Sequence, residues 1–234
     1  AAALLIGLNS AQAIVGGTPS PTAEGPLLMV LSDRGSVCSG VVISRDAVLT
    51  AAHCVTGASA YRLHWRDANG QPVMEAPKRI TLHPDYRPDA IASRKPSVDL
   101  ALIQSQGPLP AQFMPAPLPD AKQPPSPKDS LLTVRGYGLT SESKPDSIGQ
   151  LRDIRLPVVT PYGQGRLLIW LQGQGQQGAC TGDSGGGIFD PQGRLHAITV
   201  WTEGPKTASG QSHCGSMTQG VLVAPQRNWI DTIL

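Results

Sequence analysis

The stretch Cys180-Thr-Gly-Asp-Ser-Gly-Gly-Gly187 places one serine, Ser184, directly after an aspartate and among glycines. Glycines on both sides let the backbone approach a bound molecule closely and direct its N–H groups at a developing negative charge. A serine hydroxyl attacks an amide only when a neighbouring base removes its proton and a third group orients that base. Ser184 is therefore a candidate nucleophile whose partners must lie elsewhere in the chain.

The residues around Ser184 also fit the Gly-x-Ser-x-Gly pattern of the nucleophile turn in α/β-hydrolases. That turn lies between a strand and a helix, and its acid and histidine follow the serine in the sequence. Here the segments after Ser184, Gly187–Phe189 and Leu195–Trp201, have the composition of strands. Chain order therefore favours partners that precede Ser184, and an esterase that uses a later histidine such as His213 is the alternative.

The composition favours an all-β protein. Glycine (26 residues) and proline (22 residues) are abundant, whereas charged residues make up only 15% of the chain, which suits short strands joined by turns. The formal net charge is +2 and there is no block of Lys and Arg, so neither nucleic acid nor an acidic membrane surface is an expected partner. No apolar stretch is long enough for a transmembrane helix.

Residues 1–13 resemble the end of a secretory signal peptide, with an apolar run before the small-x-small site Ala11-Gln12-Ala13. We therefore expect a secreted or periplasmic protein, in a compartment that permits disulfides. Four cysteines allow three pairings, and local spacing favours Cys38 with Cys54 and Cys180 with Cys214. Because the chain has no Cys-x-x-Cys motif and no closely spaced histidine pair, we expect no metal and no cofactor.

The strand pattern divides into two halves around a proline-rich connector. We expect a first β-rich unit over residues 14–110, a connector over 111–130, and a second β-rich unit with a C-terminal helix over 131–234. The apolar and alternating segments predict strands at 27–31, 40–43, 47–52, 61–65, 72–80, 98–103, 131–135, 151–159, 167–171, 187–189, 195–201 and 220–223. Pro225 and the apolar positions after it predict a short helix to the end of the chain.

Several motifs occur together in one order. They are Ile14-Val-Gly-Gly17, Leu49-Thr-Ala-Ala-His-Cys54, Asp99-Leu-Ala-Leu102, Gly136-Tyr-Gly138 and Gly182-Asp-Ser-Gly-Gly186. With these motifs the chain, from Ile14 to Leu234, resembles a trypsin/chymotrypsin-type serine protease, of the secreted bacterial type. The resemblance implies two antiparallel six-stranded Greek-key β-barrels and a short C-terminal helix. It also implies a monomer that acts on proteins or peptides and that protein protease inhibitors can bind.

The resemblance assigns a role to each motif. Ser184 is the nucleophile, His53 the general base and acid, and Asp99 the group that orients His53. The backbone N–H groups of Gly182 and Ser184 form the oxyanion hole. The α-amino group of Ile14, once freed by proteolysis, pairs with Asp183; because a signal-peptidase-like site precedes Ile14, we expect export itself to free it.

The specificity pocket follows from the same resemblance. Gly178, six residues before Ser184, forms its base, Trp201 and Thr202 lie along one side, and Gly220 forms the opposite wall. Without a carboxylate at Gly178, cleavage after Arg or Lys is not expected. A β-branched Thr202 narrows the pocket, so we expect a small or medium apolar residue before the scissile bond.

Two further hypotheses remain open. Asp67, Asn69 and Glu75 could form a calcium loop, although acids in turns are usually just solvated and the spacing is unlike an EF-hand. The chain could also be a non-catalytic binding or adhesion protein that kept the protease fold, because a fold does not determine a function.

Overall fold

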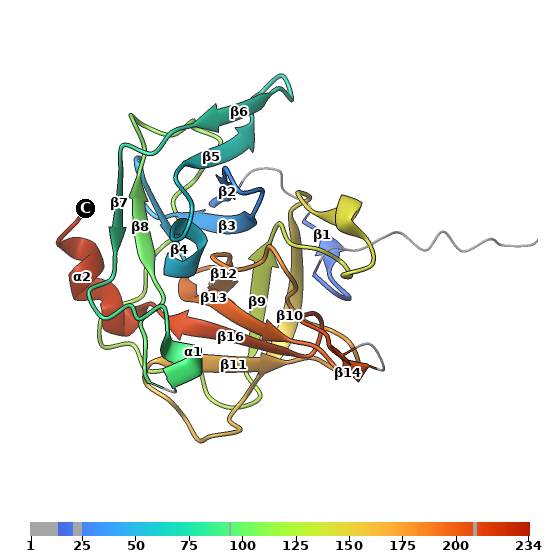
Figure 1. Cartoon of the computed structure of the whole chain (residues 1–234). Helices are drawn as coiled ribbons and strands as arrows, with labels where there is room; N and C mark the ends of the chain where they lie inside the picture. The colour runs from blue at the N-terminus through green and yellow to red at the C-terminus, as the bar shows by residue number, and fades with distance from the viewer. Residues whose placement is uncertain (1–13, 21–24, 94, 208–209) are drawn as a thin grey trace, which may run out of the picture.

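The computed structural model describes residues 14–20, 25–93, 95–207 and 210–234. The signal-like segment 1–13 lies outside the described residues. Two large antiparallel sheets make up most of the molecule, and Figure 1 shows them as a blue-to-green half above a yellow-to-red half. The expected all-β architecture is therefore confirmed.

The first sheet contains seven strands in the order β6-β5-β2-β3-β4-β8-β7. In chain order they are β2 (Leu27–Ser32), β3 (Val37–Val42), β4 (Ala47–Thr50), β5 (Tyr61–Arg66), β6 (Pro72–Glu75), β7 (Arg79–Leu82) and β8 (Ala101–Gln104). The sequence predicted one strand over 72–80, but Pro77, which has no N–H to donate, separates β6 from β7. These two strands pair with β5 and β8, respectively, and form the two edges of a sheet that is open in the described residues, where a closed six-stranded barrel was expected.

The second sheet is a closed barrel. Its strands are β9 (Leu131–Gly136), β10 (Arg152–Val159), β11 (Leu168–Gln172), β12 (Gly187–Phe189), β13 (Leu195–Glu203) and β16 (Met217–Leu222). They follow the order β10-β11-β16-β13-β12-β9, and the pairing of β9 with β10 closes the ring of six. A two-residue strand, β1 (Thr18–Pro19), adds to the outside of β10, and β14 (Lys206–Thr207) pairs with β15 (Gly210–Gln211) as a separate hairpin.

Burial follows the alternation of the strands. In β5, Tyr61, Leu63 and Trp65 face the core, while Arg62 and Arg66 are exposed. All four residues of β4 are buried, because this central strand is covered on both faces.

Short helices lie at the ends of strands. They are η1 (Ala52–Val55), α1 (Ala90–Ser93), η2 (Pro145–Ser147), η3 (Ala224–Gln226) and α2 (Arg227–Asp231). The predicted C-terminal helix therefore exists as η3 and α2, and α2 returns to the first sheet beside β7 and β8 (Figure 1). The ring of Trp229 in α2 packs edge-on against His83 at 4.7 Å. None of the helices in the described part of the chain is long and apolar enough to cross a bilayer.

Both predicted disulfides are present. Cys38–Cys54 joins β3 to η1, with a Cα–Cα distance of 6.0 Å. Cys180–Cys214 joins the segment before Ser184 to the segment before β16, with a Cα–Cα distance of 4.1 Å. Each disulfide therefore anchors one of the segments that carry a candidate catalytic residue.

Candidate active site

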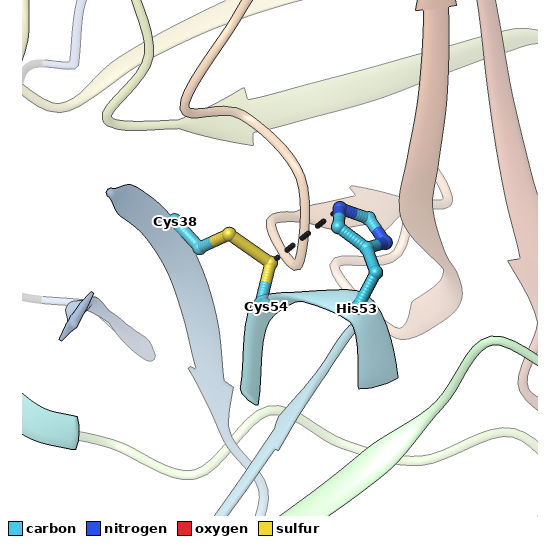
Figure 2. A group of neighbouring side chains, drawn as sticks. All are labelled: Cys38, His53 and Cys54. Carbon is cyan, nitrogen blue, oxygen red and sulfur yellow. Dashed lines mark hydrogen bonds between the residues drawn. A yellow bond between two sulfur atoms is a disulfide. The ribbon is translucent and has the colours of Figure 1, made fainter. Parts of the chain in front are cut away.

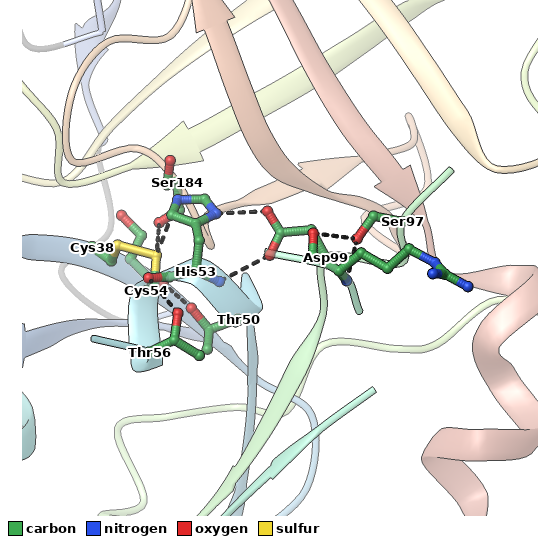
Figure 3. A network of polar contacts seen from close by, with 10 residues as sticks. Cys38, Thr50, His53, Cys54, Thr56, Ser97, Asp99 and Ser184 are labelled. Carbon is green, nitrogen blue, oxygen red and sulfur yellow. Dashed lines mark hydrogen bonds and ion pairs between the residues drawn. A yellow bond between two sulfur atoms is a disulfide. The ribbon is translucent and has the colours of Figure 1, made fainter. Parts of the chain in front are cut away.

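His53 is held by Asp99 at two points. Strands β4 and β8 pair Thr50 with Ala101, and this pairing brings together the two segments that adjoin those strands, η1 and the residue before Leu100. Asp99 Oδ1 accepts a hydrogen bond from the backbone N–H of His53 at 2.9 Å, and Asp99 Oδ2 lies 2.6 Å from His53 Nδ1 (Figure 3). Because an ionised carboxylate only accepts, His53 Nδ1 carries the proton and Nε2 is left as the basic nitrogen.

The imidazole Nε2 is directed at the Cys38–Cys54 disulfide. It lies 3.7 Å from Cys54 Sγ (Figure 2). Ser184 lies beside the ring (Figure 3), and its backbone carbonyl oxygen is 3.6 Å from the same sulfur. In the described residues no hydrogen bond joins Ser184 Oγ to His53, a separation common in proteases without bound substrate.

Gly185 allows the Ser184 loop to lie directly against the first sheet. A Cβ at this position would lie 2.1 Å from the carbonyl oxygen of Ser39 and 2.2 Å from Thr50 Oγ1. Its φ of +82° is also one that L side chains rarely adopt. The glycine after Ser184 is therefore required by both the contact and the backbone conformation.

Ser39, on β3, is a site residue that the sequence analysis missed. Its N–H donates to the carbonyl of Ser184 at 2.8 Å, and its hydroxyl donates to the carbonyl of Gly182 at 3.0 Å. The same hydroxyl accepts from the N–H of Tyr137 at 3.0 Å. The available signal was a serine between Cys38 and the strand predicted over 40–43. Ser39 therefore links the nucleophile loop to both halves of the molecule.

The N–H groups of Gly182 and Ser184 donate no hydrogen bond within the described residues. Their neighbours are bonded: the N–H of Asp183 donates to Cys180 O at 3.1 Å and that of Gly186 donates to Asp183 O at 2.9 Å. The two N–H groups predicted for the oxyanion hole are thus available to a ligand.

Asp183 is fully buried in a cradle made by two glycines. Its Oδ1 accepts from Gly138 N at 2.8 Å and its Oδ2 from Cys180 N at 2.9 Å. A Cβ at Gly136 would lie 2.3 Å from Oδ1, and one at Gly138 would lie 2.5 Å from Cγ, so only glycine leaves room for the carboxyl group. Burial raises the pKa of Asp183 to about 7, although both hydrogen bonds and the positive charge of Arg152 act in the opposite direction.

Ile14 is buried in the core of the second barrel. It packs in the same apolar cluster as Leu132 and Ala179, and its carbonyl accepts from Gly17 N at 2.7 Å. The next residue, Val15, pairs with Gly178, whose N–H donates to Val15 O at 3.1 Å. In the described residues no ion pair joins Ile14 to Asp183.

Gly178 faces Ser216 and Thr218 rather than Gly220. A Cβ built on Gly178 would lie 3.2 Å from Ser216 N and 3.3 Å from Thr218 Oγ1. One built on Gly220 would lie 2.6 Å from Ile188 Cδ1, inside the barrel core. The pairing of β16 with β13 explains this difference. Gln219 lies opposite Trp201, so Gly220 lies one position further along β16 and faces the barrel core. Thr218 therefore lies next to Gly178, in the place where the sequence analysis expected Gly220.

A cleft of about 640 Å³ runs between the two sheets beside His53. Leu168, Trp170, Trp201 and Gln219 line it from the second barrel, and Tyr86 lines it from the first half. The rings of Trp170 and Trp201 meet edge-on at 6.0 Å. The predicted site residues His53, Asp99 and Trp201 thus border one continuous, mainly apolar groove.

The side chains that could bind a metal ion make other bonds in this structure. Cys38, His53 and Cys54 lie close together (Figure 2), but both sulfurs belong to the disulfide and cannot act as thiolate ligands. In the loop considered for calcium, Asp67 Oδ1 accepts from the N–H groups of Asn69 and Gln71, both at 2.8 Å. These bonds form the turn itself, as expected for a solvated turn acid.

His213, the histidine that an esterase mechanism would need, is exposed. Its N–H donates to Glu142 Oε1 at 2.9 Å and its carbonyl accepts from the hydroxyl of Thr202. Its ring makes no hydrogen bond with Ser184 in the described residues. The geometry therefore favours His53 as the base.

Comparison with known proteins gives evidence on the family of this chain that is independent of the site geometry. Residues 14–221 match the family model described as Trypsin. The chain is 30% identical over 216 residues to human serine protease 56, which covers 82% of this chain and 34% of that protein. The chain thus spans about a third of the length of that relative. It is 27% identical to mouse cathepsin G (94% of this chain, 78% of that protein) and 28% identical to α-fibrinogenase albofibrase of the snake Trimeresurus albolabris (97% and 89%).

Solved structures share the fold. Human heparin binding protein aligns with a TM-score of 0.73 at 21% identity, covering 94% of this chain and 96% of the other. Neuropsin, a serine protease expressed in the limbic system of mouse brain, aligns with a TM-score of 0.75 at 20% identity, covering 94% and 99%. The named relatives are animal proteins, so they give no support to the expected bacterial type.

Proposed function

The chain belongs to the trypsin family, and from that premise we propose that it is a serine endopeptidase that uses Ser184, His53 and Asp99. The observation that carries this proposal is the two-point contact between Asp99 and His53, at 2.9 and 2.6 Å, beside a serine loop with two unengaged N–H groups. This arrangement supplies a nucleophile, an oriented base and an oxyanion site in one place.

Each residue has a defined step. Ser184 Oγ attacks the scissile carbonyl carbon while His53 Nε2 takes the hydroxyl proton, and the N–H groups of Gly182 and Ser184 stabilise the oxyanion. His53 then gives the proton to the leaving amine, and an acyl-enzyme remains. Water, deprotonated by His53, hydrolyses that ester and regenerates the serine. Asp99 holds the imidazole in one tautomer and stabilises its positive charge throughout.

The pocket favours a small apolar residue before the scissile bond. Thr218 and Ser216 lie within 3.4 Å of a Cβ placed on Gly178, and Thr202 pairs with Thr218 on the neighbouring strand. β-Branched side chains at Thr202 and Thr218 leave little room for an aromatic or long basic side chain. Proteins or peptides with alanine or valine at this position are therefore the substrates we propose, and inhibitor proteins that present such a residue would compete.

The segment before Ile14 bears on how the enzyme is activated and on where it acts. Cleavage before Ile14 frees an amino group that pairs with Asp183, in a secreted or periplasmic monomer. The burial of Ile14 in the core of the second barrel supports this pairing.

The second candidate is a binding protein on the same fold. The observation in its favour is that Nε2 of His53 points at Cys54 Sγ, at 3.7 Å, with no hydrogen bond to Ser184 Oγ among the described residues. One of the structural neighbours is named for heparin binding, a property stated here only of that neighbour.

An intact mass spectrum after treatment with a fluorophosphonate probe tests the proposal. We expect a secreted chain that begins at Ile14 and carries one adduct, which Ser184→Ala abolishes. His53→Ala should abolish the adduct as well, whereas His213→Ala should leave it unchanged. A correctly processed chain without an adduct would support the binding protein, and an adduct that depends on His213 would support the esterase.

A further inference from the structure

The cleft beside His53 has one positively charged wall. The charged residues that line the cleft are His53, Arg87, Lys95 and Asp99. Both carboxylate oxygens of Asp99 are engaged by His53, at 2.9 and 2.6 Å. Arg87 and Lys95 are exposed, and neither forms an ion pair in the part of the chain that the structure describes. Two cationic side chains can therefore meet an anionic group that enters the cleft.

The same two cations line a second, smaller cavity of about 350 Å³. The residues common to both cavities are Arg87, Lys95, Pro96, Ser97 and Leu167. The loop that carries Arg87 and Lys95 also contains two carboxylates. Asp85 lines the smaller cavity only, and Asp89 lines neither of the two. The wall that the two cavities share therefore carries positive charge towards the wider cleft.

Hydrogen bonds fix the backbone that carries the two cations. Ser97 Oγ accepts from the N–H of Arg87 at 2.8 Å, and Ser97 lies close to Asp99 (Figure 3). Ala90 N donates to Arg87 O at 3.2 Å, and Lys95 N donates to Ala90 O, also at 3.2 Å. Because this loop is already hydrogen-bonded, an anion can bind to it without the cost of ordering its backbone.

The second barrel supplies an apolar and aromatic wall to the same cleft. Trp170 and Trp201 meet edge-on there, with ring centroids 6.0 Å apart. None of Gly178, Ser216 and Thr218 lines this cleft, so it is distinct from the pocket proposed for the residue before the scissile bond. The chemistry of the two walls fits an extended peptide that carries both apolar and acidic side chains.

The two ring nitrogens of His53 indicate which half of a substrate enters the cleft. Nε2 faces the Cys38–Cys54 disulfide, whereas Nδ1 faces Asp99 (Figure 3). In the proposed mechanism Nε2 gives its proton to the leaving amine, so the leaving half lies towards the disulfide. Asp99 lines the cleft and neither cysteine does. The cleft therefore receives the acyl half, which stays on Ser184.

We propose that Arg87 and Lys95 are specificity-determining residues that select substrates with an acidic side chain in the acyl half. The acidic residue lies two to four positions before the scissile bond, because the residue directly before that bond occupies the pocket at Gly178. This inference rests on the proposed peptidase function and names its class of substrate. Both cations are exposed, so the selection is electrostatic and weakens as the ionic strength rises.

A set of fluorogenic peptides tests the proposal. Each peptide has alanine directly before the scissile bond and either glutamate or glutamine at the second, third or fourth position before it. We expect kcat/KM for the best glutamate peptide to exceed that of its glutamine counterpart about fivefold at about 20 mM salt, and less than about twofold at about 500 mM. Arg87→Gln/Lys95→Gln should lower the ratio at low salt to less than about twofold, mainly by raising KM for the glutamate peptide.

Two further variants control this experiment. Lys122→Gln/Lys128→Gln changes the net charge equally at two exposed positions of the connector that line neither cavity, and it should keep the ratio. Arg87→Glu/Lys95→Glu should favour lysine over glutamine at the same position, which a loss of structure would not produce.

Three results would overturn the proposal. They are a wild type without preference for glutamate, an equal loss of preference in the connector variant, and a preference that depends on Arg87 and Lys95 only when glutamate follows the scissile bond. The last result would show that the cleft receives the leaving half.

Binding to the Ser184→Ala protein separates this inference from the proposed function. Fluorescence anisotropy of labelled glutamate and glutamine peptides measures Kd without hydrolysis. Tighter binding of the glutamate peptide that is lost in Arg87→Gln/Lys95→Gln supports the proposal. If the wild type then cleaves no peptide and takes up no fluorophosphonate, the peptidase alone is overturned. Cleavage of both peptides with equal Kd and kcat/KM values would support the peptidase and overturn this inference.

Discussion

Ser39 Oγ donates a 3.0 Å hydrogen bond to the carbonyl of Gly182, although the two residues are 143 positions apart in the chain. The same hydroxyl accepts from Tyr137 N at 3.0 Å, so one buried side chain fixes the loop that carries the nucleophile. Nothing in Ser39 itself can react with substrate in this arrangement. Its contribution is to hold the peptide group between Gly182 and Asp183, which lies next to the two N–H groups that we propose as the oxyanion hole.

Ser39→Ala should therefore lower both stability and reactivity. The buried carbonyl of Gly182 and the N–H of Tyr137 would lose a partner, and each such loss costs about 1–3 kcal/mol. We expect a lower free energy of unfolding in urea and a labelling rate at Ser184 reduced at least tenfold. Ser36→Ala, which removes an exposed hydroxyl on the preceding turn, is the control. Unchanged labelling in a destabilised Ser39→Ala protein would show that the bond serves only stability.

Asp99→Asn tests the orientation of His53. The new amide group can donate a hydrogen bond to His53 Nδ1, which must then be the acceptor. The ring proton would lie on Nε2, so Nε2 could no longer act as the base. In the chymotrypsin example of this triad the corresponding change lowers kcat about 10⁴-fold, and we expect a loss of about 10³–10⁴-fold here. Hydrolysis of fluorescently labelled casein measures the loss, with the exposed Asp120→Asn as the matched control. A loss below tenfold would contradict the proposed role.

The three candidate catalytic residues and the strand pattern could be proposed from the sequence because each depends on local features. His53 and Cys54 follow a buried apolar strand, and Ser184 lies among glycines whose conformational freedom marks a loop. The disulfide partners followed from spacing, and the structure confirms both. The roles of His53, Asp99 and Ser184 stay predictions until they are measured.

Other features depend on strand register and on contacts between distant segments, which the spacing of residues along the sequence does not reveal. Thr218, and not Gly220, lies next to Gly178; the two positions differ by two residues along β16, and only the pairing of β16 with β13 shows which of them is there. The hydroxyl of Ser39 joins segments that are far apart in the sequence. The sequence shows Pro77, but it does not show which strands β6 and β7 pair with. Those pairings leave the first sheet open in the described residues.

Thr218→Ser should relax the specificity of the pocket. Serine keeps a hydroxyl that can accept from Ala179 N, as Thr218 Oγ1 does at 3.0 Å, while the methyl group is lost. One methyl group in a pocket is worth about 1–3 kcal/mol, so the ratio of kcat/KM for leucine over alanine before the scissile bond should rise roughly 10-fold or more. A series of peptide anilides measures this ratio. Thr133→Ser on β9, which lines a different cavity beside Arg135 and Phe189, should leave it unchanged. An unaltered ratio in Thr218→Ser would remove Thr218 from the pocket.

The pH dependence of stability tests the state of Asp183. Burial raises the pKa of its carboxyl group from 3.8 to about 7, so the folded uncleaved chain binds a proton that the unfolded chain releases above pH 4. The free energy of unfolding of the uncleaved chain should therefore fall as pH rises from about 4 to about 7, by on the order of 2–4 kcal/mol from this group, and level off above.

Asp183→Asn isolates this contribution. Burial lowers the pKa values of His83 and His196, so their contribution to the free energy of unfolding increases with pH over part of this range. This contribution is the same in both proteins and cancels in the comparison. We expect the difference in stability between Asp183→Asn and wild type to change with pH in the uncleaved chain. After cleavage the Ile14 ammonium should favour the ionised carboxylate and lower its pKa, so the same difference should become flatter above pH 4. Urea unfolding at a series of pH values measures both curves, and identical slopes before and after cleavage would mean that the freed amino group does not reach Asp183.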